Sequence, residues 1–163
     1  MTAQDKMVAD GDSVDTGVAA TMEIAKGLAD ALADTYKLMI KTHIYHWNVE
    51  GPMFYAVHNL TESQYTDLFA AADTIAERIR ALGLLAPLSS KDVLDGSVIK
   101  EAMPDDAASM CQELADDHEA VAKRMHKLIK LAGDSSDPVT DDLITGRSAF
   151  HEKAAWMLRA IAK

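Results

Sequence analysis

The stretch HIYHWNVEGPMFYAVHNLTE, residues 43–62, ends one amphipathic pattern and begins another. Apolar residues recur at helical spacing on both sides of the break, over about residues 18–48 and 53–82. Gly51 and Pro52 separate the two patterns, because proline cannot continue a helix. The stretch therefore predicts two long helices joined by a short turn.

Two more helices are predicted in the second half of the chain, over about residues 106–132 and 138–163. Gly133 is expected to end the first of them, and Asp137 or Ser136 to cap the second. The residues of the last helix predicted to face inward are Leu143, Phe150, Ala154, Met157 and Ile161.

A long connection separates the two helical pairs, and a short helix is expected in it near Val93. Almost no alternation of β-branched residues competes with the helical patterns. Short links within each pair and one long link between the pairs predict an all-α four-helix bundle with a long crossover between helices two and three. This is the ferritin-like connectivity.

A chain of 163 residues is long enough for one domain with a real core. Residues 18–163 are predicted to form the bundle, and residues 1–17 a flexible acidic N-terminal segment. The one cysteine, Cys111, excludes an internal disulfide. No apolar run is long enough to span a bilayer, and no signal pattern begins the chain, so a cytoplasmic location without a membrane partner is expected.

Four side chains of the second predicted helix are candidate metal ligands: His58, Glu62, Asp73 and Glu77. At about 100° per residue they form one stripe, on the face almost opposite to the apolar stripe of that helix. A solvated polar face is one interpretation of this stripe. Phe69 and Ala76 share the face, however, and favour a surface that is partly covered.

The two ligand pairs, 58/62 and 73/77, lie about 22 Å apart along the helix, so one metal centre cannot use both from one chain. A twofold axis between residues 67 and 68 would set His58 opposite Glu77, and Glu62 opposite Asp73, in a second copy. His46, beside the turn between the helices, can complete each cluster. Imidazole and carboxylate donors together suit iron, manganese or zinc.

Three segments resemble the Dps family (DNA-binding protein from starved cells, the mini-ferritins): KTHIYHWNVEGPMFYAVH, DTIAERIRALG and DLITGRSAFHEKAAWMLRA. The resemblance covers about residues 25–163. It implies a homo-oligomer, a hollow dodecamer of twofold dimers, with a two-iron ferroxidase centre between twofold-related subunits. It implies that His46, His58 and Glu62 come from one subunit and Asp73 and Glu77 from its partner. The family often has aspartate at the position of Glu62. Glutamate at this position keeps the negative charge, and its side chain is longer than that of aspartate.

The resemblance also implies the activity. The chain is expected to be a ferroxidase that oxidises Fe(II), preferably with hydrogen peroxide, and deposits ferric mineral in the shell, so that the cell and its DNA are protected from oxidative damage. Two ferrous ions can each give one electron to peroxide, which avoids hydroxyl radical. Zinc is a second candidate metal for part of the centre.

Two residues beside His46 are candidate accessory groups. His43 is either a supplementary metal ligand or a hydrogen-bonded histidine on a semi-apolar stripe. Trp47 is either an electron donor to a half-filled centre or a core residue at a helix end. The other histidines, at positions 118, 126 and 151, lack ligand partners in the sequence pattern and are assigned no role.

Asp137, Asp141 and Asp142 crowd the start of the last helix, where acidic side chains interact favourably with the positive end of the helix dipole. In the resembling shells, acidic residues at this position line a pore for entering ferrous ions. Asp142 matches that position best. Helix capping and an iron-entry pore therefore both stay open as interpretations of this cluster.

The charge pattern argues against DNA binding through a basic tail. The formal net charge is −10, and no cluster of lysine or arginine is present for phosphate contacts. The alternative function is a non-enzymatic, nucleoid-associated protein that compacts DNA and keeps a vestigial metal site. A di-iron oxygenase within one bundle is disfavoured, because no glutamate has a histidine three residues further on. Asn59 and Ser63 stand where relatives often carry inner-surface glutamates.

Overall fold

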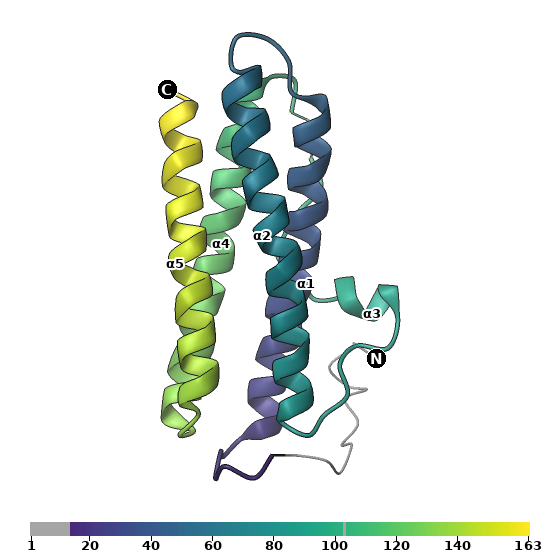
Figure 1. The fold of residues 1–163 in the computed structure, drawn as a ribbon, viewed down its shortest axis with the longest axis vertical. Coiled ribbons are helices and arrows are strands. Elements are labelled where there is room, and N and C mark those ends of the chain that lie inside the picture. Colours follow the sequence, from purple (N-terminus) through teal and green to yellow (C-terminus); the bar gives the residue numbers. More distant parts are fainter. Residues whose placement is uncertain (1–13, 103) are drawn as a thin grey trace.

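The computed structural model describes residues 14–102 and 104–163. Four long helices run side by side along the molecule (Figure 1): α1 (Thr21–Asn48), α2 (Phe54–Ala81), α4 (Ala107–Asp134) and α5 (Pro138–Ile161). The short helix α3 (Ser90–Leu94) lies in the crossover, beside α1. The described residues contain no β-strand. The predicted all-α four-helix bundle with a long crossover and a short helix in it is confirmed.

The ends of the last two long helices show one correct and one wrong prediction. Asp137 caps α5, because its side chain accepts a hydrogen bond from the backbone N–H of Thr140 at 2.9 Å. Gly133 does not end α4, which continues to Asp134. The left-handed turn falls instead on Ser136, whose φ is 58°. The chain thus reverses direction three residues later than the glycine suggested.

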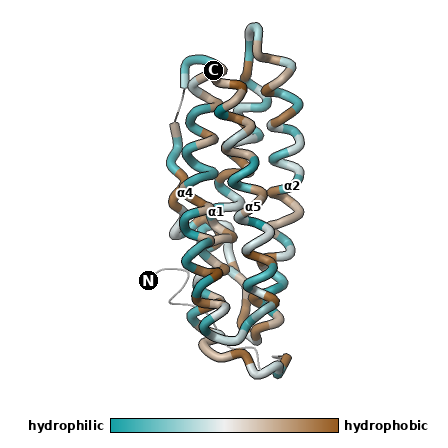
Figure 2. The backbone as a smooth tube through the Cα atoms, turned by 90° about the vertical axis from the view of Figure 1, so that its left-hand side faces the viewer, coloured by the Kyte–Doolittle hydropathy of each residue, from teal (hydrophilic) through white to brown (hydrophobic). Residues whose placement is uncertain are grey.

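The core is apolar along all four long helices, and Figure 2 shows hydrophobic residues recurring along each of them. The stripe of α2 matches its helical period, since Val57, Leu68 and Ile75 are completely buried. The stripe predicted for α5 is confirmed in part: Ala154 is buried, and Leu143, Phe150 and Ile161 are partly buried and pack against the core. Met157 is partly buried and is not part of that contact. The buried line of α5 runs through Ile144, Ser148, His151, Ala155 and Leu158.

Ionic contacts hold the long crossover against the bundle. Arg124 on α4 forms ion pairs with Asp30 and Asp34 on α1 and donates to the carbonyl of Gly96 at 2.8 Å. Asp34 also accepts from the backbone N–H of Val98 at 2.8 Å. Burial raises the pKa of Asp34, while these hydrogen bonds and Arg124 act in the opposite direction. The crossover is therefore fixed to both α1 and α4.

The predicted flexible segment, residues 1–17, lies mostly outside the described residues. Within the described part, the backbone N–H of Val14 bonds to the carbonyl of Ala81, and that of Ala19 bonds to the carbonyl of Ser135. These bonds fasten the chain to the ends of α2 and α4 before α1 begins. Among the described helices, none combines the length and apolar character that crossing a membrane requires.

Candidate metal centre

His46 and His58 come together where the α1–α2 hairpin turns. Their rings stack with centroids 3.7 Å apart and an interplanar angle of 20°. Each Nδ1 faces the other residue's carbonyl: His46 Nδ1 lies 2.9 Å from the oxygen of His58, and His58 Nδ1 lies 3.0 Å from the oxygen of His46. Because a carbonyl only accepts, both Nδ1 atoms carry the proton. Both Nε2 atoms therefore keep the lone pair that binds a metal.

Thr61 supports this pair from within α2. Its side chain is completely buried, and Oγ1 lies 2.7 Å from the carbonyl of Val57 and 3.0 Å from that of His58. The same oxygen lies 3.4 Å from His46 Nδ1. Thr61 thus packs behind the imidazole of His46 and against the carbonyl that this ring faces, in the position from which ligand histidines are usually oriented.

The carboxylates of the predicted site lie on the same helix but do not join the histidines. Glu62, Asp73 and Glu77 are all exposed on α2. Within residues 14–102 and 104–163, no three His, Cys, Asp or Glu side chains gather closely enough to hold a metal ion. A single chain therefore supplies two imidazoles and leaves the three carboxylates open to solvent.

Several large apolar side chains of α1 and α2 are exposed in the single chain. Trp47 is 63% exposed, Phe69 64% and Tyr55 79%, and Ile40, Ile44 and Phe54 are also exposed. Exposed apolar residues in such number on neighbouring helices mark an interaction surface rather than a face made for water. The sequence predicted a partly covered surface on α2 from Phe69, and the exposed apolar residues extend this candidate interaction surface to α1.

Aromatic contacts explain His43 and Trp47. The ring of His43 lies between Trp47 at 4.2 Å and Tyr65 at 4.1 Å, centroid to centroid. Ring contacts hold His43 within the described part of the chain, and its two interpretations, supplementary metal ligand and hydrogen-bonded histidine, both stay predictions. Trp47 is not a core residue within one chain, because most of it is exposed. The sequence prediction missed Tyr65, which also meets His46 edge to face at 5.2 Å and lies two helical turns after His58.

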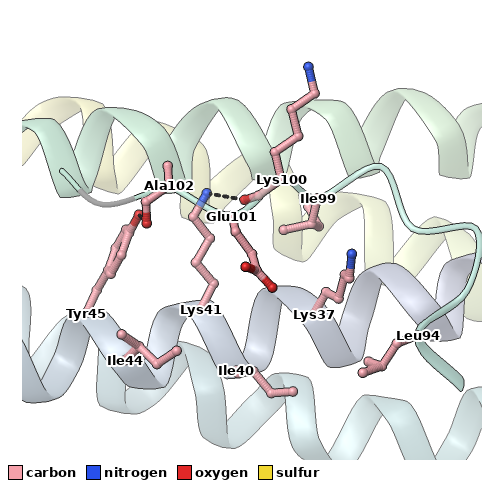
Figure 3. A pocket seen from close by; sticks show the side chains of 10 residues that line it. All are labelled: Lys37, Ile40, Lys41, Ile44, Tyr45, Leu94, Ile99, Lys100, Glu101 and Ala102. Atoms are coloured by element: carbon pink, nitrogen blue, oxygen red, sulfur yellow. Dashed lines mark hydrogen bonds between the residues drawn. The ribbon is translucent and has the colours of Figure 1, made fainter. Parts of the chain in front are cut away.

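Polar contacts with α4 and the crossover anchor the last two turns of α1. Lys41 Nζ lies 2.6 Å from Asp117 and 3.0 Å from the carbonyl of Lys100, as Figure 3 shows for the latter. Tyr45 donates to Glu113. Burial and this carboxylate raise the pKa of Tyr45, so that its hydroxyl stays a donor. These contacts fix the segment of α1 from which His46 projects.

A cavity of about 290 Å³ lies beside this segment, between α1 and the crossover (Figure 3). Ile40, Ile44, Leu94 and Ile99 give it apolar walls, and lysine side chains lie at its margin. Glu101 is the one carboxylate among its lining residues, and no histidine or cysteine lines it. The cavity is therefore a packing gap beside the candidate centre and no second metal site.

In the acidic cluster at the start of α5, one residue caps the helix and the other two have no assigned role. Asp137 is completely buried and accepts from Thr140 Oγ1 at 2.6 Å and from Arg78 at 2.7 Å. Burial acts against ionisation, but the bonds from Thr140 and Arg78 hold the pKa of Asp137 below its ordinary value. The capping interpretation thus applies to Asp137. Asp141 is half-buried and Asp142 is exposed, so both remain candidates for a pore.

A second histidine pair lies where the sequence prediction assigned no role. His118 on α4 and His151 on α5 are both completely buried, with their Nδ1 atoms 2.8 Å apart. Burial, with Arg147 nearby, lowers the pKa of His118 to about 3. Burial, with His118 and Arg147, also lowers the pKa of His151 well below its usual value. His151 lies seven residues after Ile144 and seven before Leu158, on the same face of α5 as these two buried residues. This spacing could have identified it as buried.

Comparison with known proteins gives consistent matches over nearly the whole chain. A ferritin-like domain model matches residues 25–163. DNA protection during starvation protein 2 of Bacillus anthracis is 36% identical over 139 residues, which are 85% of this chain and 95% of that protein. The crystal structure of antigen TpF1 from Treponema pallidum has a TM-score of 0.84 at 36% identity, covering 93% of this chain and 99% of that one. A Dps protein of Vibrio cholerae O1, described as a member of a broad superfamily of ferritin-like diiron-carboxylate proteins, has a TM-score of 0.82 at 30% identity, covering 93% and 100%.

Proposed function

Because the chain belongs to the Dps family of ferritin-like proteins, we propose that it is a ferroxidase that oxidises ferrous iron at a centre shared by two subunits and stores the ferric product inside a shell. Hydrogen peroxide is the preferred oxidant in this proposal, and the shell is a dodecamer of twofold dimers in the cytoplasm. Its biological effect is protection of the cell and its DNA from the reaction of free ferrous iron with peroxide.

The observation that carries the proposal is the geometry of His46 and His58. Two backbone carbonyls fix both rings in the tautomer that frees Nε2, with His46 buried and His58 half-buried. A purely structural histidine pair has no need to hold both ring orientations in this way. Backbone carbonyls behind ligand histidines are the common means of setting a metal-binding tautomer.

A second copy supplies what the single chain lacks. Asp73 and Glu77 lie on the same exposed face as Glu62, about 22 Å along α2 from the histidine end. An antiparallel partner across a twofold axis would bring one chain's Asp73 and Glu77 to the other chain's His58 and Glu62, twice. The exposed apolar residues Trp47, Tyr55 and Phe69 would then be covered in the same contact.

The donor set suits the proposed reaction. Imidazoles bind ferrous iron, and carboxylates stabilise the ferric product by their charge. Each of two ferrous ions gives one electron to one hydrogen peroxide, whose O–O bond breaks to give two hydroxide ions, so the electrons balance without a radical product. Zinc in part of the centre is a possible variation on the same donor set. Trp47, ring to ring with His43, is placed to give an electron when only one iron is present.

The charge of the chain suits entry of cations. A net charge of −10 per chain raises the local concentration of ferrous ions around a shell. Asp141 and Asp142 at the start of α5 are the candidate pore residues, since Asp137 is committed to its buried cap. The same negative charge opposes contact with phosphates, so the proposed protection of DNA is chemical and does not depend on compaction.

The test is a peroxide pulse after anaerobic loading with ferrous iron, with ferric absorbance followed in time. The test variant is His58→Ala with Glu62→Ala. A matched control is His126→Ala with Glu152→Ala, which removes another exposed histidine–carboxylate pair, 3.0 Å apart on α4 and α5. Fast oxidation by wild type and control, lost in the test variant while gel filtration shows an intact shell, supports the proposal. Equal rates in all three proteins would move the function to a structural role.

A further inference from the structure

A layer of polar side chains crosses the interior of the bundle, with one member from each long helix: Thr42, Gln64, His118 and His151. Three of them are completely buried, and Gln64 is 3% exposed. The surrounding core is apolar. A polar layer of this kind is costly unless every donor and acceptor in it is satisfied.

Contacts between neighbouring helices show that the four residues lie at one level. His118 and His151 touch directly. The pairing of Arg147 with Asp67 sets position 151 of α5 opposite about position 63 of the antiparallel α2, next to Gln64. In the same way, the contact of Lys41 with Asp117 sets position 118 of α4 opposite about position 40 of α1, half a turn from Thr42.

Several atoms of this layer, and of Arg147 near its histidines, have no hydrogen-bond partner among the described residues: Thr42 Oγ1, both amide atoms of Gln64, Nε2 of His118, Nε2 of His151, and Nε and Nη2 of Arg147. The histidine pair is only half satisfied, because the ring that donates through Nδ1 keeps an acceptor at Nε2, and the ring that accepts presents an Nε2–H donor. Donors and acceptors are thus both unpaired, on atoms that are shielded from bulk solvent.

The charges around the layer decide what can fill it. Arg147 is paired through Nη1 with Asp67 at 2.6 Å, so the local net charge is close to zero. A divalent cation would find neutral donors only, beside a guanidinium. An anion would add a charge in an apolar core without a free cation. The ligand that matches unpaired donors and unpaired acceptors together is a small neutral molecule that does both.

We propose that the bundle contains an internal hydration site, in which buried water molecules join Gln64 and Thr42 to the free Nε2 atoms of His118 and His151. Buried waters characteristically make about three hydrogen bonds to polar groups that would otherwise lack partners. In this site they take the place of direct contacts between α2 and the α4–α5 pair. The α2–α5 seam is therefore held partly by water.

A groove provides the route to the site. A cavity of about 280 Å³ lies between α2 and α5, lined among others by Leu60, Ser63, Asp67 and Phe150. Gln64, whose two buried amide atoms lack a partner among the described residues, also lines this cavity. Lys153 lies at the same groove. In this proposal, water reaches the layer from the groove by way of Gln64, the member of the layer that lines it.

The first test replaces the amide with an apolar side chain of similar size, Gln64→Leu, and compares melting temperatures at one protein concentration. If waters fill the site, the variant leaves them and the histidines without a partner, and the melting temperature falls. If the layer is dry, the variant removes two unpaired buried groups, and the melting temperature rises or stays unchanged, which overturns the proposal. Gln112→Leu, the same change at an exposed position of α4, is the control and should have little effect.

The second test does not depend on a variant that folds. A crystal structure of the wild-type protein, at a resolution that shows ordered water, should have density within hydrogen-bond distance of Gln64 and of both free Nε2 atoms. Direct contacts between these side chains, with no density between them, would overturn the proposal. A metal-like peak with short bonds to the histidines would also overturn it, because the ligand would then be a cation.

Discussion

His46 and His58 stack at the turn of the α1–α2 hairpin, whereas His118 and His151 meet inside the α4–α5 seam. In the first pair each Nδ1 faces a backbone carbonyl, and in the second pair the two Nδ1 atoms face each other. The first pair borders an exposed face, and the second is completely buried. The same side chain thus gives two free metal-binding nitrogens in one place and a closed proton-sharing contact in the other.

The hydrogen-bond partner of Nδ1 decides which tautomer an imidazole adopts and whether its Nε2 is free to bind a metal. A carbonyl can only accept, so it fixes the tautomer of its histidine and leaves Nε2 for a metal. Another imidazole can donate or accept, so it fixes only that the two rings have opposite tautomers. Burial then prevents the second pair from gaining a charge. The first pair suits ligand binding, and the second contributes to stability only while it is neutral.

The largest expected effect is on acid stability, and it comes from the buried pair. In the unfolded chain both histidines titrate near pH 6.5, whereas burial lowers the pKa of His118 to about 3 and lowers that of His151 as well. The unfolded state therefore binds more protons below about pH 6.5, and stability falls as the pH falls. Each histidine lowers the free energy of unfolding by about 1.4 kcal/mol per pH unit, so the loss reaches up to about 5 kcal/mol over two units.

Urea unfolding followed by far-UV circular dichroism at a series of pH values measures this dependence. Replacing both residues by leucine, His118→Leu with His151→Leu, should flatten the fall below pH 6.5. His126→Gln, at an exposed position, should leave the slope as in wild type. An unchanged slope in the double variant would show that other groups cause the acid sensitivity, and the contrast between the pairs would lose its energetic basis.

A matched pair of single variants should separate the two roles. We expect His58→Gln to slow ferrous oxidation by about tenfold or more, because a ligand is lost, with stability changed by only about 0.5 kcal/mol. We expect His118→Gln to lower the free energy of unfolding by about 1–3 kcal/mol, because it disturbs a buried hydrogen bond, and to leave the oxidation rate of the folded shell unchanged. Peroxide-pulse kinetics and urea unfolding of both variants check the prediction. Loss of oxidation in His118→Gln at full stability would contradict it.

The fold could be read from the sequence because periodicity and helix breaks report it directly. The α2 stripe of Val57, Leu68 and Ile75 and the break at Gly51 both reflect local chemistry. The inward face of α5 could be read only in part from its apolar residues, because Ser148 and His151 are polar and yet lie on the buried line. The apolar pattern alone therefore included Phe150 and Met157 in the predicted inward face, although both residues are only partly buried.

The sequence predicted the part of the candidate site that depends on spacing within one helix. Spacing along α2 selects His58, Glu62, Asp73 and Glu77, and the turn brings His46 near them. Contacts across helices depend on packing register, which the sequence does not show. The crossed bonds of His46 and His58 with backbone carbonyls, the ring contact of Tyr65 with His43, and the meeting of His118 with His151 are all of this kind.

The smallest expected effect concerns the environment of His46 in the first pair. Thr61→Val removes the buried hydroxyl 3.4 Å from His46 Nδ1 and keeps the side-chain shape. The carbonyl of His58 still holds that nitrogen at 2.9 Å, so the tautomer of His46 should survive. We therefore expect metal affinity, measured by titration with ferrous iron under anaerobic conditions, to fall by less than about tenfold, the low end for a group behind a ligand histidine. Leu60→Ala, a change of the same helix on the groove side, is the comparison, and it should leave the affinity unchanged. A loss as large as that of His58→Gln would mean that the hydroxyl, and not the carbonyl, fixes the ring.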